Sequence, residues 1–145
     1  MTFYFLFIMF FSGTPAEGKL KASVIMETAE KGLTPMNEML VSIGYKSSAN
    51  IIVGGNVTDS TYSYWNSRKE NFSISVENNK VSQVIFDIKE KTYALALLEE
   101  FKSFGFKIRE NQTTEKRIKE DYQMGKIKFT IKQMGSLYDF NLKFG

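Results

Sequence analysis

The sequence contains no cysteine and no histidine. Without them the chain cannot build a His-dependent triad, a cysteine nucleophile or an ordinary zinc site. It also cannot form a disulfide or carry a lipid on a modified cysteine, so its stability must come from its core. We therefore expect no catalytic residues, no metal and no other cofactor. A small hydrolase that depends on carboxylates, or an enzyme using a serine and a lysine, is the alternative left open.

Two pairs of adjacent carboxylates bear on that alternative, Glu99-Glu100 and Glu120-Asp121. Neighbouring residues on a helix diverge by about 100 degrees, so neither pair is expected to point at one substrate. Gly54-Gly55 follows an apolar run, but no Gly-Lys-Ser/Thr comes after it, so we interpret it as a turn rather than a phosphate loop.

A strong charge of one sign is also lacking. The 19 basic and 16 acidic residues give a net charge of only +3. Nucleic-acid binding calls for a larger and more clustered basic excess, so we do not expect a nucleic-acid partner.

The N-terminal apolar run, Phe3 to Phe11, is much shorter than the roughly 20 residues that span a bilayer. Small residues follow it, and Glu17 is the first charged residue. We interpret residues 1–16 as a signal peptide that is removed, although no Lys or Arg precedes the run. This predicts a secreted or periplasmic protein with no stable transmembrane anchor after cleavage. The alternative is a buried N-terminal strand or helix.

In the rest of the chain, residues 17–145, one short sequence occurs twice in similar form. Residues 40–46 read LVSIGYK, and residues 101–107 read FKSFGFK. Each copy ends an amphipathic stretch at a glycine and leads toward segments with alternating apolar residues. We therefore predict a single α+β domain with two helix-plus-hairpin repeats, about residues 32–88 and 89–145.

Two helices are predicted at the two copies of this sequence. For the first, Thr34 is the expected N-cap, Pro35 the first helical residue and Gly44 the end; its apolar face is Met36, Met39, Leu40 and Ile43. The second covers residues 93–104, with Thr92 as N-cap and Gly105 at the C-terminal cap; its apolar face is Ala94, Leu97, Leu98, Phe101 and Phe104. Residues 20–31 are ambiguous between helix and strand, with helix favoured.

Alternation predicts the strands and their register. Residues 51–53 are a short strand candidate, and an aromatic strand begins at Tyr62. In the first hairpin a plain two-residue turn at Asn78-Asn79 puts the two apolar stripes on opposite faces. A longer loop or a bulge instead pairs Ile74 with Val84 and Phe72 with Phe86, and we predict that register.

For the last hairpin, a turn at Met134-Gly135 pairs Ile131 with Tyr138, Phe129 with Phe140 and Ile127 with Leu142. Residues 106–109 are expected to form a short strand, and residues 111–120 an exposed loop or short helix. The result is a largely antiparallel sheet with helices packed on one face and the other face wet.

The order of these elements, with a helix closing on Gly105-Phe106-Lys107 and a final Lys-rich hairpin, resembles a group of uncharacterised secreted proteins of Gram-negative bacteria. More distantly it is similar to the PepSY-like and β-lactamase-inhibitor-like two-repeat folds. The resemblance covers residues 34–145 in outline and carries no catalytic residues. It implies a secreted or periplasmic binding or inhibitor-like role. An envelope structural or assembly role is a further alternative, favoured if a sheet edge pairs with a partner strand.

Alternation in the last hairpin also assigns lysines to one face. If Ile127, Phe129 and Ile131 face the core, the opposite face carries Lys126, Lys128, Lys132 and Lys143. This basic sheet face is the candidate binding site, and it predicts an anionic partner, such as an acidic protein, a lipid or a polysaccharide surface. The alternative is that these lysines only keep a wet sheet face from aggregating.

Overall fold

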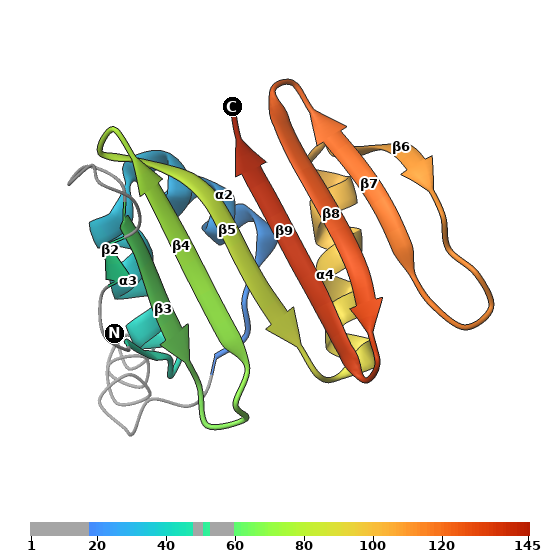
Figure 1. The fold of residues 1–145 in the computed structure, drawn as a ribbon, viewed down its shortest axis with the longest axis horizontal. Helices are drawn as coiled ribbons and strands as arrows, with labels where there is room; N and C mark the ends of the chain where they lie inside the picture. Colours follow the sequence, from blue (N-terminus) through green and yellow to red (C-terminus); the bar gives the residue numbers. More distant parts are fainter. Residues whose placement is uncertain (1–17, 48–50, 53–59) are drawn as a thin grey trace, which may run out of the picture.

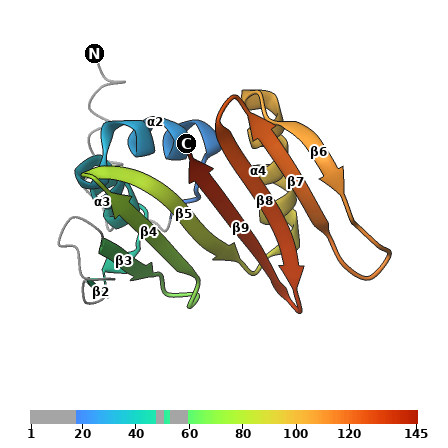
Figure 2. The same ribbon diagram turned by 45° about the horizontal axis from the view of Figure 1, so that its top comes forward.

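The computed structural model describes residues 18–47, 51–52 and 60–145. The predicted signal peptide, Val53 and Gly54-Gly55 lie outside these residues. In the described part, three α-helices lie on one side of one antiparallel sheet (Figures 1 and 2): α2 (Ala22–Lys31), α3 (Leu33–Ser42) and α4 (Lys91–Phe104). The α+β class is therefore confirmed, and the ambiguous stretch forms helix α2.

The described strands all join this sheet, in the order β1-β3-β4-β5-β9-β8-β7-β6, and β2 also pairs with β3. The sheet has two halves with the same strand order from the edge inward. One half is β1, β3, β4 and β5, the other is β6, β7, β8 and β9, and the halves meet where β5 pairs with β9. The duplication itself stays a prediction. The strands are β1 (Lys46–Ser47), β2 (Ile51–Ile52), β3 (Ser60–Trp65), β4 (Asn71–Glu77), β5 (Lys80–Ile88), β6 (Lys107–Asn111), β7 (Lys119–Met124), β8 (Ile127–Met134) and β9 (Leu137–Phe144).

The repeated sequence forms the same helix end twice. After α3, the Tyr45 N–H donates to the Leu40 carbonyl over 2.9 Å, and Gly44 has a φ of 102°. After α4, the Phe106 N–H donates to the Phe101 carbonyl over 3.2 Å, and Gly105 has a φ of 136°. This is the Schellman pattern, in which a glycine with positive φ reverses the chain. The chain therefore passes directly from α3 into strand β1 and from α4 into strand β6, each at an edge of the sheet.

Both predicted N-caps are wrong. Helix α3 follows Gly32 and α4 follows Glu90, so Thr34 and Thr92 lie inside the first turns and cap nothing. Gly32, with a φ of 117°, allows the sharp bend between α2 and α3 and brings the start of α3 forward to Leu33. The start of α2 is capped from another helix, because its Ala22 N–H donates to Glu100 Oε1 of α4 over 3.0 Å.

The first hairpin has the predicted register. Phe72 pairs with Phe86 and Ile74 with Val84, whereas Val76 pairs with Val81 beyond a bulge. The turn is Asn78-Asn79, with φ of 52° and 63°, which suits a two-residue type I′ hairpin. The bulge therefore shifts the pairing by one residue relative to the register that the two-residue turn sets. As a result both apolar stripes face the helices.

The second hairpin is shifted from the prediction by two residues. Its turn is Gly135-Ser136, so Ile131 pairs with Phe140, Phe129 with Leu142 and Ile127 with Phe144. Gly135 has a φ of 62°, a conformation that methionine at the first turn position resists. Because the shift is an even number of residues, the apolar side chains keep the predicted face.

The core is organised by aromatic rings on the helix side of the sheet. The rings stack from strand to strand with centroids 4.9 to 5.7 Å apart, and the series is Phe72, Phe86, Phe140, Phe129 and Tyr122. We call this series the aromatic ladder. Phe101 of α4 packs on Phe129 and Phe140. The predicted inner face of α4 is confirmed except for Phe104, which is 44% exposed.

The aromatic ladder predicts a large difference between neighbouring residues of β9. Phe140→Ala removes a fully buried ring at the centre of the sheet, and we expect it to lower the free energy of unfolding by about 3–5 kcal/mol. Asn141→Ala alters the opposite face, and we expect a loss below about 1 kcal/mol. Urea unfolding followed by the fluorescence of Trp65 measures both. Equal losses would contradict the division into a buried and an open face.

Candidate functional site

The candidate site is the sheet face that points away from the helices. Buried and less buried residues alternate along β4, β5, β8 and β9, so every second side chain belongs to this face. Trp65 is 46% exposed there, whereas Tyr64 is buried on the other side and donates to Asn37 Oδ1 over 2.9 Å. Tyr64 and Trp65 therefore lie on opposite faces of the sheet.

The structure brings three of the four predicted lysines close together. Lys128 of β8 and Lys143 of β9 are direct cross-strand partners. Lys126 lies one step away but in the β7–β8 turn, since β8 begins at Ile127. Lys132 lies four residues further along β8, roughly 13 Å away at the usual rise per residue, and faces Asp139. The predicted set is thus a cluster of three with one distant member.

Lys107, which sequence reasoning did not select, extends the same row. Lys143, Lys128, Gln123 and Lys107 are successive partners across β9, β8, β7 and β6. Adjacent strands lie about 4.8 Å apart, so three lysines line one short path across the sheet. We call Lys107, Lys128 and Lys143 the lysine row.

Arg109 also reaches this face, although no sequence signal predicted it. The register of β6 and β7 shifts between Ile108 and Glu110, so Arg109 has no partner across the ladder. Such a bulge re-aims a side chain. Arg109 Nη1 donates to Gln123 Oε1, which places the guanidinium beside the lysine row.

In the part of the chain that the structure describes, these cations form no ion pair with a carboxylate. The ion pairs in the described part of the chain join Lys31 to Glu27, Arg68 to Glu70 and Lys102 to Glu99, and none lies on this face. A shallow depression of about 460 Å³ opens beside the lysine row, and its lining includes Arg109, Glu110, Asp121, Gln123, Lys128 and Thr130.

A pair of carboxyl groups lies on the open face where the two central strands of the sheet pair, near the end of β5 and the start of β9. Asp87 of β5 and Asp139 of β9 are direct partners, and Asp87 Oδ1 accepts the Asn71 N–H over 3.1 Å. Burial raises the pKa of both carboxyl groups above the usual value, and the charge of Asp87 raises the pKa of Asp139 further. The sequence pattern did not pair them, because their register depends on contacts between the two halves.

The carboxylate pairs suggested by the sequence do not converge. Glu99 binds Lys102, while Glu100 reaches the start of α2. Glu120 accepts the Tyr122 hydroxyl, while Asp121 accepts the Thr130 hydroxyl on the open face. Glu120 and Asp121 diverge because successive side chains of strand β7 point to opposite faces, and not because they lie on a helix as predicted. In residues 18–47, 51–52 and 60–145, no three carboxylates gather closely enough to hold a metal ion.

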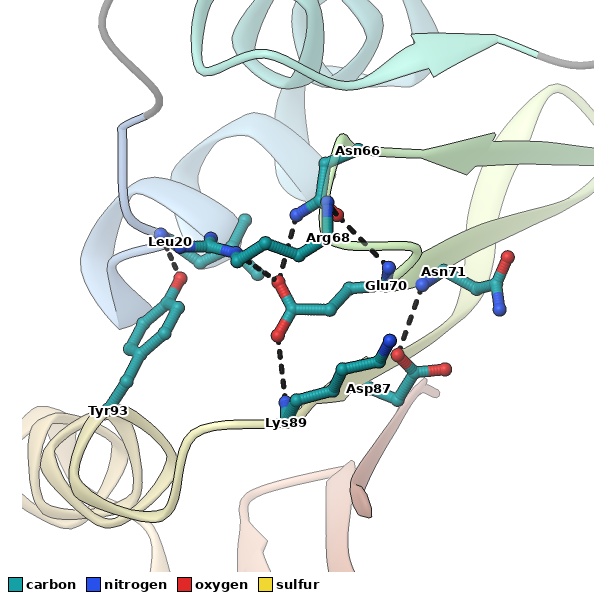
Figure 3. A network of polar contacts seen from close by, with 8 residues as sticks. All are labelled: Leu20, Asn66, Arg68, Glu70, Asn71, Asp87, Lys89 and Tyr93. Atoms are coloured by element: carbon teal, nitrogen blue, oxygen red, sulfur yellow. Dashed lines mark hydrogen bonds and ion pairs between the residues drawn. The ribbon is translucent and has the colours of Figure 1, made fainter. Parts of the chain in front are cut away.

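The most buried carboxylate, Glu70, has a structural role (Figure 3). Its Oε1 accepts from Asn66 Nδ2 and Arg68 Nε at 2.9 and 3.0 Å, and its Oε2 accepts the Lys89 N–H at 2.7 Å. This network ties the β3–β4 turn to the end of β5. Nearby, the Tyr93 hydroxyl accepts the Leu20 N–H, and burial raises the pKa of Tyr93 to about 12. The burial of Glu70 and the three hydrogen bonds that it accepts indicate that it stabilises this corner of the fold.

A second cavity lies between the helices and one end of the sheet. This groove of about 1010 Å³ is lined by apolar side chains that include Met26, Phe104, Met124, Ile127 and Phe144. Its lining also includes Glu27, Glu30, Lys31 and Lys80, so charge selects no occupant. None of the described helices is long and apolar enough to cross a membrane.

Comparison of the chain with protein-family models, with curated proteins and with solved structures finds no match. The function must therefore be argued from the residues of the open face.

The Glu70 network yields a stability prediction. Glu70→Ala removes the acceptor of the Lys89 N–H and of the Asn66 amide together with the ion pair to Arg68, and we expect the free energy of unfolding to fall by about 2–4 kcal/mol. The matched change Glu77→Ala, at an exposed position of the same strand, should cost less than about 0.5 kcal/mol. Urea unfolding measures both variants. A loss for Glu70→Ala no greater than that for Glu77→Ala would contradict the structural role.

The central carboxyl pair yields a pH-dependent prediction. Because the folded pKa of Asp139 is raised, its ionised form opposes folding above that pKa, and this penalty vanishes below the unfolded value of about 3.9. Asp139→Asn should therefore stabilise the protein at pH 7, by less than about 1 kcal/mol since the group is partly exposed. Urea midpoints at pH 7 and pH 3 measure the effect. A gain of equal size at both pH values would assign it to packing instead of charge.

Proposed function

We propose that this protein is an exported, non-catalytic binding protein of the inhibitor-like kind, and that its open sheet face holds an acidic protein partner. The observation that carries the proposal is the lysine row together with Arg109. These four cations gather on a face that the described helices leave uncovered, and no carboxylate pairs with them there. A positive patch on an open face attracts and orients a partner of opposite charge.

Export is supported by the apolar run and small residues at the N-terminus. The non-catalytic part of the proposal is supported by the missing histidine and cysteine and by the occupied oxygens of Glu70. The carboxylate-dependent hydrolase remains the alternative, with Asp87 and Asp139 as its best residues. Neither residue lines either of the two cavities described above.

An assembly role through an open sheet edge is less well supported. Strand β6 forms one edge of the described sheet, and all five of its residues are exposed. However, the strand is short, rich in charge and interrupted by the bulge at Arg109. These features discourage the addition of another strand.

Charge reversal in the lysine row tests the proposed function. The full chain with an affinity tag would be used to capture proteins from envelope extract of its host, beside the variant Lys128→Glu/Lys143→Glu. We expect a captured partner to be lost by the variant and released by salt, with affinity reduced at least tenfold, or about 1.4 kcal/mol.

The matched control is Lys21→Glu/Lys91→Glu, which makes the same change in net charge at exposed positions near the starts of α2 and α4. This control should keep the partner. If both double variants capture the same proteins as the parent, the lysines serve solubility and the proposal fails.

A further inference from the structure

The depression beside the lysine row contains an arginine whose orientation is fixed on two sides. The bulge in β6 leaves Arg109 outside the ladder and directs it to the open face, where it binds Gln123 Oε1. The other end of that amide, Gln123 Nε2, donates to the Gly125 carbonyl in the β7–β8 turn over 2.7 Å. The turn thus holds the amide, and the amide holds the guanidinium.

A second cation shares the depression with Arg109. Lys128 lines it from β8 and is the direct partner of Gln123. Only one guanidinium nitrogen of Arg109 is engaged with Gln123, and that acceptor is neutral. The fork of a guanidinium matches the two oxygens of a carboxylate, whereas an ammonium acts as a point charge. Arg109 and Lys128 therefore suit a single carboxylate held between them.

Acidic residues border the same depression. Glu110 and Asp121 are cross-strand partners that both line it. Asp121 is held by the Thr130 hydroxyl at 2.7 Å, and Glu110 by Gln112 Nε2 at 2.6 Å. These neutral partners leave both negative charges in place. A dense polyanion that follows the lysine row would bring its next charges against them, which disfavours it by repulsion.

We infer that Arg109 anchors the binding site by gripping an isolated carboxylate, the side chain of an Asp or Glu on a folded partner, and that Glu110 and Asp121 exclude polysaccharide and lipid polyanions. This inference rests on the proposed function, and it selects one source of negative charge. Gln123 is the positioning residue, because its amide joins the guanidinium to the β7–β8 turn.

The first test uses N-acetylglutamate whose α-carboxyl is amidated, so that the side-chain carboxylate is its only charge. Titration into the ¹⁵N-labelled protein should shift the backbone amides of Gln123, Lys128 and Thr130, with a dissociation constant on the order of 1 mM. Arg109→Lys keeps the charge but loses the fork, and we expect binding at least fivefold weaker. Arg117→Lys, the same change in the exposed β6–β7 loop, should bind like the parent.

A parent protein without saturable shifts, or an Arg109→Lys variant that binds like the parent, would overturn the anchor. If Lys128→Glu/Lys143→Glu still loses its captured partner in that case, the proposed function stands and only this inference fails. The amide spectrum of each variant also reports whether its fold is intact.

The second test addresses the acidic border. On immobilised heparin, Glu110→Gln/Asp121→Asn should elute at higher salt than the parent, because repulsion of the polyanion is removed. The control Glu38→Gln/Glu115→Gln makes the same change in net charge at exposed positions elsewhere and should shift elution less. Equal shifts, or a parent that already binds heparin more tightly than the Glu110→Gln/Asp121→Asn variant does, would overturn the exclusion of polyanions.

Discussion

The aromatic ladder is the interaction on which the rest of the structure depends. Its rings stack across five neighbouring strands and continue through the contact of Phe86 with Phe140, where the two halves of the sheet meet. Because side chains alternate along a strand, fixing the ladder on the helix side also fixes which residues face outward. The lysine row and the central carboxyl pair are therefore placed by the same packing that buries the phenylalanines.

Charge on the open face is arranged in rows that follow this pairing. Lysines share one row across β6 to β9, and Glu110 and Asp121 face each other in the next. Such a pattern fits a partner with its own arranged charges better than a uniformly negative one, because specificity requires repulsion as well as attraction. In the proposed function, the pairing of the strands would therefore set the selectivity of the site.

Local sequence patterns predicted the fold where alternation decides the outcome. The pairing of Ile74 with Val84 follows from the need to bury both stripes, and the helix ends follow from Gly44 and Gly105. The pattern could not identify Glu100 as the cap of α2, because that contact depends on how two helices pack. For the same reason the sequence did not reveal Glu70 or the Asp87–Asp139 pair.

The candidate site was predicted in part. Lys128 and Lys143 share the open face as strand alternation requires, but they are direct partners only because the register of the last hairpin differs from the predicted one. A one-residue bulge adds Arg109, which neither the composition nor the alternation of the sequence indicates. Lys132 is an even number of residues from Lys126 and Lys128, so alternation places it on the same face. Alternation does not show that it lies too far along the strand to join them. The last hairpin turns at Gly135-Ser136 and not at Met134-Gly135 as predicted, which shifts the pairing by two residues. Because two residues is one full period of a strand, the same side chains still face the core.

The central position of β9 has a consequence for how the chain acquires this structure. Gln83 pairs with Lys143, so β5 gains its second neighbour only when the last strand has been made. Until then β5, which is rich in valine and isoleucine, is an unpaired edge of the kind that associates with other chains. Pairings so distant in sequence also slow folding. The full sheet therefore closes late in folding, because the pairing that joins its two halves brings together segments far apart in the sequence.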